Sequence, residues 1–342
     1  PLGTRDRHLN AHGGRLKDSG VDGRIIELFR SGDGVVSGAA LSRLLGVSRT
    51  AVWKHVKGLR AAGYLIEAVP SKGYRLLSSP KLLNQLDLSS GLATRRVGSR
   101  IVCLKETEST NQVAFKMAEE GAVEGTVVIA DAQSAGKGRL GRVWLSPAGV
   151  NLYCSVVLRP SIAPMAACQL TFLSVVAVAR AIESCTSLKP QIKWPNDILI
   201  NGKKVAGLLN EMNAETEKVN FVVLGIGVNL NLRMSSISES LLRHPATSLI
   251  EEGGEEVDRV AFARRLLVEL DELYDVFLQE GEGPVRAEWL ERSAIQGRSV
   301  KVSQGEREFT GEVQGVDSFG ALLVKLSDGR IETVLSGDVA LI

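Results

Sequence analysis

The spacing of apolar residues changes twice along this chain, and this constrains the fold more than any other feature. Residues 24–79 show helical spacing followed by one short alternating run, residues 99–291 mix apolar runs with long helical segments, and from residue 292 apolar residues recur at every second position. Helices have a period of 3.6 residues and half-buried strands a period of two. At 342 residues the chain also exceeds one ordinary domain. We therefore predict three folded units (24–79, 99–291 and 292–342), with a flexible lead at 1–23 and a linker at 80–98.

The first unit has the pattern of a winged helix-turn-helix. Apolar stripes predict three helices, of which the second ends at Gly46 and the third begins after Ser48. A glycine suits the left-handed backbone that often ends a helix, and a serine is a good N-cap. The alternating run from Tyr64 to Leu76 has Pro-Ser-Lys-Gly at its centre, which predicts a hairpin wing.

The charge of this unit predicts that it binds DNA. The net charge of the chain is only +2, yet Arg24 to Ser78 contains nine Lys/Arg and three acids, and no acid occurs from Gly34 to Ile66. A basic helix of this kind fits the major groove, with a wing residue at a phosphate. The predicted DNA-contacting residues are Arg49, Thr50, Trp53, Lys54 and Lys57 on the third helix and Lys72 on the wing. The alternative is a winged unit that contacts only protein or that is a relic of a gene fusion.

The rest of the chain predicts an α+β fold. Strand-like runs alternate with helices predicted at 111–121, 165–185 and 256–279, and Asn201-Gly202 between two apolar runs predicts a hairpin within a mixed sheet. Polar residues interrupt the apolar helix at 165–185, so we predict a buried core helix and no membrane span. The last unit has five short alternating runs, typical of a small SH3-like β-barrel.

Cysteine usage and the N-terminal sequence predict the cellular location. The four cysteines lie far apart, without metal-ligand spacing, so we expect reduced thiols in the cytoplasm and no dedicated metal site. Residues 1–23 are polar and glycine-rich, which is unlike the apolar core of a signal peptide.

A glycine-rich basic loop lies in the longest acid-free stretch. No Asp or Glu occurs from Ala132 to Ile182, and Gly136–Arg142 reads GKGRLGR. Glycines let the backbone approach a ligand, and Lys and Arg bind phosphate or carboxylate. The segment matches G-x-G-x-x-G, but Val-Trp-Leu-Ser-Pro follows instead of a helix, and Gly138 stands where a P-loop has Ser or Thr. The loop therefore predicts another kind of anion site; the alternative is a mobile basic surface loop.

The loop resembles the GRGRxGRxW loop of biotin–protein ligases, with Lys137 in place of its first arginine. Further matches occur in the family's order: Glu108-Ser109-Thr110-Asn111, Gln133, Lys193-Trp194-Pro195-Asn196-Asp197, Lys203-Lys204-Val205-Ala206-Gly207 and Gly225-Ile226-Gly227-Val228-Asn229. With the winged unit in front and the small barrel behind, the whole chain resembles bifunctional biotin–protein ligases that also repress the biotin operon.

The resemblance implies a two-step reaction. Biotin and ATP form biotinyl-5′-adenylate, and the biotinyl group passes to a lysine of the carrier domain of a biotin-dependent carboxylase. It implies catalytic roles for Arg139, Lys204 and Lys193, whose charge offsets the repulsion between two anions. The implied biotin-binding residues are Ser109, Thr110, Asn111, Gln133, Lys137, Gly138, Arg139, Lys204, Gly207, Gly225 and Gly227, and the implied ATP-binding residues are Arg142, Lys193, Asn196 and Asn229.

The same resemblance implies further partners. Mg²⁺ would sit on the ATP phosphates without a protein cage. Operator DNA and, in the adenylate-bound state, a second copy of the chain complete the expected partners.

Several of these residues also have purely structural interpretations. Ser109 and Thr110 could be an ordinary helix N-cap, Gln133 a surface residue at a strand end, Gly225 and Gly227 a β-bulge, and Trp144 a core aromatic. Two other functions stay open: a biotin-sensing regulator without catalysis, and a lipoate-type ligase. The winged unit and the loop argue against the lipoate-type ligase, and release of pyrophosphate would separate the enzyme from the sensor.

Overall fold

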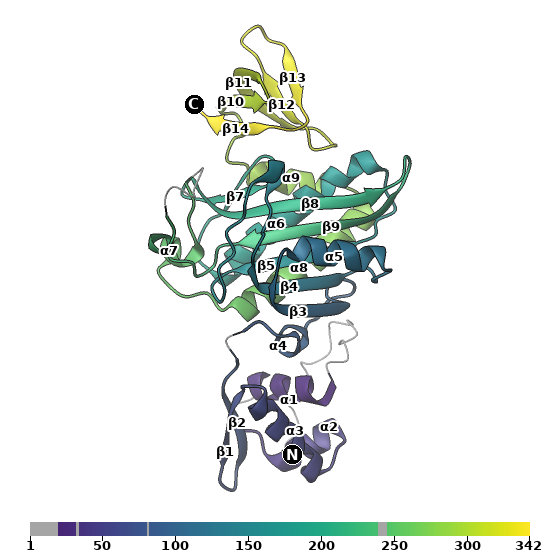
Figure 1. Cartoon of the computed structure of the whole chain (residues 1–342), viewed down its shortest axis with the longest axis vertical. Helices are drawn as coiled ribbons and strands as arrows, with labels where there is room; N and C mark the ends of the chain where they lie inside the picture. The colour runs from purple at the N-terminus through teal and green to yellow at the C-terminus, as the bar shows by residue number, and fades with distance from the viewer. Residues whose placement is uncertain (1–19, 32–33, 81, 239–244) are drawn as a thin grey trace, which may run out of the picture.

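The computed structural model describes residues 20–31, 34–80, 82–238 and 245–342. The units follow one another along the long axis of the molecule (Figure 1): a helical unit with a hairpin, a central unit built on a large sheet, and a small sheet unit at the C-terminus. This is the predicted α+β architecture.

The N-terminal unit is a winged helix-turn-helix. Ser37 and Ser48 cap the second and third helices by accepting from the backbone N–H groups of Ala40 and Ala51, and Gly46 ends the second helix with φ +67°. Its elements are α1 (Gly20–Ser31), α2 (Gly38–Leu45), α3 (Arg49–Ala61), β1 (Leu65–Val69) and β2 (Gly73–Ser78), with β1 and β2 antiparallel.

The predicted lead at 1–23 extends too far, because α1 begins at Gly20. Val21 packs against the apolar core of the winged unit, and Gly23 is buried, so the first turn belongs to the folded unit. Residues 1–19 lie outside the described residues.

The predicted linker at 80–98 connects the first two units, but it is packed rather than loose. It contains α4 (Gln85–Ser89), which contacts α1 on one side and α8 and β3 of the central unit on the other. Leu88 and Leu92 are buried in the core of the central unit. Asp87 is fully buried and accepts from Arg30 at 2.8 Å and from the hydroxyl of Tyr64 at 2.9 Å. The connector therefore ties the winged unit to the central one.

The central unit is a mixed seven-stranded sheet in the order β3-β4-β5-β9-β8-β7-β6. Only β3 and β4 are parallel to each other among these neighbours. The strands are β3 (Arg100–Thr107), β4 (Thr126–Gln133), β5 (Leu152–Leu158), β6 (Gln191–Lys193), β7 (Asp197–Ile200), β8 (Lys203–Ala214) and β9 (Val219–Val228). The predicted Asn201-Gly202 hairpin joins β7 and β8.

Helices cover the two faces of the sheet. On one face α6 contacts β8 and β9, and α8 and α9 pack against α6; on the other face α5 contacts β4, β5 and β9. The helices are α5 (Thr110–Glu119), α6 (Gln169–Cys185), α7 (Leu249–Gly253), α8 (Arg259–Glu280) and α9 (Gly283–Glu291), with 3₁₀ turns η1 (Arg139–Gly141), η2 (Pro164–Cys168) and η3 (Met234–Ser236). The predicted helix at 256–279 starts three residues later, because Asp258 is its N-cap.

One helical segment of the described chain, Pro164–Cys185, is long and apolar enough to cross a membrane. Its first five residues form the 3₁₀ turn η2, and its helix α6 has Leu170, Leu173 and Ile182 fully buried. Contacts with the sheet, α8 and α9 account for this burial. The segment is thus a core helix, as predicted.

The C-terminal unit is a five-stranded antiparallel sheet in the order β13-β12-β11-β10-β14. Its strands are β10 (Ser299–Gln304), β11 (Arg307–Val316), β12 (Leu322–Lys325), β13 (Ile331–Val334) and β14 (Asp338–Leu341). The strand order is linear, so the ladder stays open between β13 and β14. Val300, Val302 and Val324 are buried and continuous with the core of the central unit.

The connector gives a testable stability prediction. Asp87→Ala leaves Arg30 and Tyr64 without their buried acceptor, and we expect the free energy of unfolding to fall by about 2–3 kcal/mol, because breaking a buried pair by removing one partner is costly. The matched control is Glu67→Ala, whose pair with Arg75 is nearly half exposed on both sides, and it should cost less than about 1 kcal/mol. Denaturant unfolding of both variants measures the difference; equal losses would contradict the role of Asp87.

Candidate active site and nucleic-acid surface

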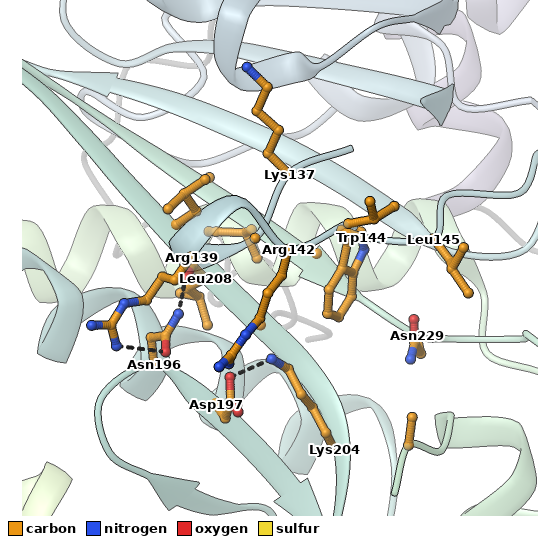
Figure 2. A pocket seen from close by; sticks show the side chains of 18 of the residues that line it. Lys137, Arg139, Arg142, Trp144, Leu145, Asn196, Asp197, Lys204, Leu208 and Asn229 are labelled. Atoms are coloured by element: carbon orange, nitrogen blue, oxygen red, sulfur yellow. Dashed lines mark hydrogen bonds and ion pairs between the residues drawn. The ribbon is translucent and has the colours of Figure 1, made fainter. Parts of the chain in front are cut away.

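The central unit contains a cavity of about 440 Å³. It lies between the glycine-rich loop, the start of α5, the strands β8 and β9, and residues of β14. Figure 2 shows side chains that line it, among them Arg139, Trp144 and Lys204. All fifteen residues that the sequence assigned to biotin or ATP line it: Ser109, Thr110, Asn111, Gln133, Lys137, Gly138, Arg139, Arg142, Lys193, Asn196, Lys204, Gly207, Gly225, Gly227 and Asn229. Segments more than a hundred residues apart therefore form one site, while the roles of individual residues stay predictions.

The cavity begins where glycines replace large residues on one face of β9. On the α5 face of β9, Phe221 and Val223 pack against α5, and the next two residues on that face are Gly225 and Gly227. Both glycines pair regularly with β5 and β8, so the alternative of a β-bulge is wrong. On this face of β9, two large side chains are followed by two glycines. The space above the glycines is the floor of the cavity.

Protein side chains occupy part of this floor. A Cβ on Gly225 would lie 2.2 Å from Oδ1 of Asn111, and one on Gly227 would lie 2.6 Å from the indole of Trp144. A Cβ on Gly207 would also meet Trp144, at 3.0 Å. These glycines are thus required by the neighbouring side chains as well as by any ligand.

The glycine-rich loop folds back on itself as a short hairpin. The N–H of Gly138 donates to the carbonyl of Arg142 at 2.7 Å, and the N–H of Trp144 donates to the carbonyl of Gly136 at 2.8 Å. At its tip Leu140 has φ +55°, a left-handed conformation that is uncommon for a branched side chain. These two backbone hydrogen bonds give the loop its hairpin shape.

Cationic side chains converge on the loop side of the cavity, and Lys204 and Arg139 each lie beside a polar partner. Lys204 forms an ion pair with Asp197 at 2.5 Å and lies over the ring of Trp144, while Arg139 approaches Oδ1 of Asn196 at 3.5 Å (Figure 2). Burial lowers the pKa of Arg139 below its usual value. An arginine remains charged in spite of such a shift, so a half-buried positive charge lines the cavity.

The C-terminal unit reaches this cationic group. Arg142 forms an ion pair with Asp338 at the start of β14, with 3.0 Å between Nη1 and Oδ1. The hydrogen bond to Asp338 raises the pKa of Arg142. Asp338 and Val339 both line the cavity. Asp338 was not predicted as a site residue, because no motif in the sequence of β14 marks it as one.

Two predicted residues are placed differently from the rest. Lys137 is exposed, and Figure 2 shows its side chain directed away from Arg139, Lys204 and Asp197. Asn229 is buried, with its amide nitrogen donating to the carbonyl of Thr247 at 3.0 Å and its amide oxygen accepting from Asn151. Both line the cavity, but Asn229 already has protein partners.

The opposite end of the cavity is polar and uncharged. Thr110 donates through its backbone N–H to Oε1 of Gln133 at 2.8 Å, and Nε2 of Gln133 donates to Ser146 at 2.9 Å. Ser109 stands at the N-cap of α5 but makes no capping hydrogen bond with its side chain. The simple N-cap interpretation of Ser109 is therefore wrong, and Gln133 is a half-buried network residue rather than a surface one.

The winged unit exposes the residues predicted to contact DNA. Arg49, Thr50, Trp53, Lys54 and Lys57 are all exposed on α3, and Lys72 is exposed at the hairpin tip. Lys57 lies over the ring of Trp53, with 5.4 Å from Nζ to the centroid. On the opposite side of α3, residues Val52, Val56 and Leu59 are buried in the module core. The helix thus presents one basic face to solvent.

Comparisons with known proteins cover all of these units. The Biotin/lipoate A/B protein ligase family profile matches residues 103–229, an HTH domain profile matches 24–75, and the biotin protein ligase C-terminal domain profile matches 296–341. The bifunctional ligase/repressor BirA of Bacillus subtilis is 39% identical over 93% of this chain and 97% of that protein. Its Escherichia coli counterpart is 34% identical, over 95% and 98%.

A comparison with solved structures gives the same family. The biotin protein ligase from Aquifex aeolicus in complex with biotin and ATP matches with a TM-score of 0.60 and 31% identity, over 71% of this chain and 98% of that chain. This chain belongs to the bifunctional biotin ligase/repressor family. The predicted fold class and the predicted enzyme class, a biotin–protein ligase, are confirmed with it.

Sequence reasoning missed several residues of this ligase. Trp144 lines the cavity beneath Lys204, although its sequence alone suggested an ordinary core aromatic. Ser146 and Ser155 hold the polar end by hydrogen bonds. The only available signal for Ser155 was a hydroxyl within the apolar run of β5, opposite a glycine of β9.

Proposed function

We propose that the chain joins biotin and ATP into biotinyl-5′-adenylate in this cavity, and then transfers the biotinyl group to a lysine of a biotin carboxyl carrier domain. The observation that carries the proposal is the convergence of Arg139, Arg142, Lys193 and Lys204 on one cavity whose other end is uncharged and polar. Both substrates of the first step are anions, and these cations lower their mutual repulsion.

In the first step, a carboxylate oxygen of biotin attacks the α-phosphorus of ATP and pyrophosphate leaves. Arg139 and Lys204 would stabilise the negative charge on the reacting oxygens, with Asn196 and Asp197 holding the two cations in place before substrate arrives. In the second step, the ε-amine of the carrier lysine attacks the acyl carbonyl, an amide forms and AMP leaves.

The two ends of the cavity suggest the direction in which biotin lies. Its ring is a cyclic urea with N–H donors and a carbonyl acceptor, which Thr110 and Gln133 can match because a hydroxyl and an amide both donate and accept. Its carboxylate then points to Arg139 and Lys204 at the loop side.

The Mg²⁺ that accompanies ATP would take its ligands mainly from phosphates and water. Within the described residues no group of three or more His, Cys, Asp or Glu side chains could hold a metal ion. Mg²⁺ is commonly bound in this manner, through substrate phosphates and few protein ligands.

Removing either cation tests the first step. Arg139→Ala or Lys204→Ala should slow adenylate formation more than about tenfold, a loss of more than about 1.4 kcal/mol of transition-state stabilisation. Single-turnover release of pyrophosphate from biotin and ATP measures the rate. Lys203→Ala is the matched control, because Lys203 is half exposed and pairs with Glu252 outside the cavity; its rate should not change.

Unchanged rates in both variants would remove the assignment of Arg139 and Lys204. Absence of pyrophosphate release by the unsubstituted chain would favour a biotin-sensing regulator without catalysis. ATP-dependent transfer of biotin to a carrier domain tests the second step directly.

The winged unit is proposed to bind operator DNA through α3. Lys54→Ala combined with Lys57→Ala should weaken operator binding and reduce the slope of log affinity against log salt by about two, because each phosphate contact releases about one counterion. Salt titrations of operator binding measure this. Lys116→Ala on α5, whose side chain is 77% exposed, is the control, and adenylate formation should be unaffected in both proteins. An unchanged salt slope would contradict DNA contact by α3.

We also propose a cytoplasmic location and adenylate-dependent homodimerisation. All four cysteines are free thiols, which suits a reducing compartment. Two winged units on a palindromic site gain affinity through symmetry. The adenylate would favour the dimerising state by ordering the glycine-rich loop, and dimerisation must then tighten adenylate binding by the same factor.

Sedimentation with and without biotin plus ATP, beside operator titrations, tests the coupling. We expect dimer affinity and operator affinity to rise together by about tenfold, within the usual range of coupling between sites. Equal affinities in both conditions would leave a ligase whose DNA-binding unit is uncoupled.

A further inference from the structure

A chain of hydrogen bonds runs behind the polar end of the cavity and begins at Glu211 on β8. The amide nitrogen of Asn111 donates to Oε2 of Glu211 at 2.7 Å and to the carbonyl of Leu209 at 3.0 Å. Both partners are acceptors only, a carboxylate and a carbonyl. The two amide protons of Asn111 are therefore committed, and its amide oxygen must face the other way.

The next link is Ser155 on β5. Its hydroxyl oxygen lies 2.6 Å from Oδ1 of Asn111 and 2.8 Å from the hydroxyl oxygen of Thr110. Oδ1 can only accept, so the single hydroxyl proton of Ser155 is donated to it. Ser155 is then an acceptor for Thr110, and the hydroxyl proton of Thr110 is directed away from the cavity.

This leaves Thr110 with an oxygen lone pair for a ligand. The other neighbour of its hydroxyl, Oε1 of Gln133, is more distant at 3.2 Å and already accepts the backbone N–H of Thr110 at 2.8 Å. Thr110, Asn111 and Ser155 are at most 5% exposed, so water has little access to reverse the direction of the chain. The direction is set by the two acceptors of the Asn111 amide, of which Glu211 is the charged and nearer one.

We propose that Glu211 is a positioning residue that fixes the direction of this chain and so presents Thr110 as a hydrogen-bond acceptor for a ring N–H of a cyclic urea. The inference rests on the proposed function, in which biotin supplies that N–H group. Glu211 is absent from the cavity lining, so it acts through Asn111 and Ser155.

The sheet register explains why the chain has this geometry. Ser155 and Leu209 are the partners of Gly225 on its two sides, and Glu211 is the next residue of β8 on the same face. The amide of Asn111 fills the space left by the absent side chain of Gly225. The amide of Asn111 can rotate in this space but cannot leave it. The hydrogen-bond acceptors around the amide therefore decide its orientation.

Without Glu211 only the carbonyl of Leu209 still accepts from the amide of Asn111, so the preference for this orientation weakens and the amide can turn over. Its nitrogen would then donate to Ser155, Ser155 would donate to Thr110, and the hydroxyl proton of Thr110 would face the cavity. A ring N–H would meet a donor instead of an acceptor, which costs the hydrogen bond and adds a repulsive contact.

A double-mutant cycle on biotin affinity tests the proposal. Glu211→Met keeps the length of the side chain without an acceptor, and Thr110→Val removes the hydroxyl with little change in shape. We expect Glu211→Met to weaken biotin binding about threefold to tenfold, the range of one hydrogen bond, and to have no further effect in the Thr110→Val background. Calorimetric titration with biotin alone measures all four proteins.

Two further variants complete the design. Glu217→Met, at an exposed glutamate of the β8–β9 turn, should bind biotin as the unsubstituted chain does. Glu211→Gln can still accept a hydrogen bond, so its biotin affinity should lie between those of the unsubstituted chain and Glu211→Met. It replaces Glu211→Met in the cycle if that variant does not fold. Additive losses in the cycle, or unchanged affinity in both Glu211 variants, would overturn the inference alone. Failure of the unsubstituted chain to bind biotin would overturn the proposed function and the inference with it.

Discussion

The absence of side chains at two positions of β9 is the constraint on which the site depends. A strand in the middle of a sheet places every second residue on the same face, and here that face reads Phe221, Val223, Gly225, Gly227. The first two residues pack against α5, and the last two leave a space beside it. Asn111 and Trp144 enter that space from different segments, and each anchors one end of the cavity.

Two of the cations of the cavity are already paired with carboxylates. Five positive side chains line a cavity of about 440 Å³ and would repel one another, but Lys204 is paired with Asp197 and Arg142 with Asp338. These pairs are only partly exposed, so each holds its cation near one position at a modest cost in side-chain entropy. An anionic substrate can then replace one carboxylate partner with another without a large rearrangement. The small C-terminal unit takes part in this balance, because Asp338 belongs to it.

Much of this architecture could be predicted from the sequence, and the failures have physical reasons. Periodicity identified the three units and nearly all strands, because an element buried on one face has apolar residues at the period of a helix or a strand. Motif order brought together residues such as Thr110 and Lys204, but it carried no information about Asp338 or Glu211. Those two act through long-range contacts that depend on sheet register and on the docking of the C-terminal unit, and neither leaves a local pattern. The segment at 80–98 appeared to be a linker because it begins with a proline and is rich in Leu, Ser and Gly, yet Leu83, Leu88 and Leu92 are buried in the core of the central unit.

That packed connector affects how the two activities can communicate. Asp87 accepts from α1 and from Tyr64 of the winged unit, while the neighbouring Leu88 is buried in the core that includes α8. A loose tether would let α3 sample many orientations, and two such helices would lose entropy on meeting two half-sites. A connector fixed by a buried carboxylate removes much of that cost before DNA is bound. In the proposed dimer, the separation of the two α3 helices would then be set by the ligase cores, so a ligand that changes how the cores associate can change DNA affinity without any contact to the winged unit.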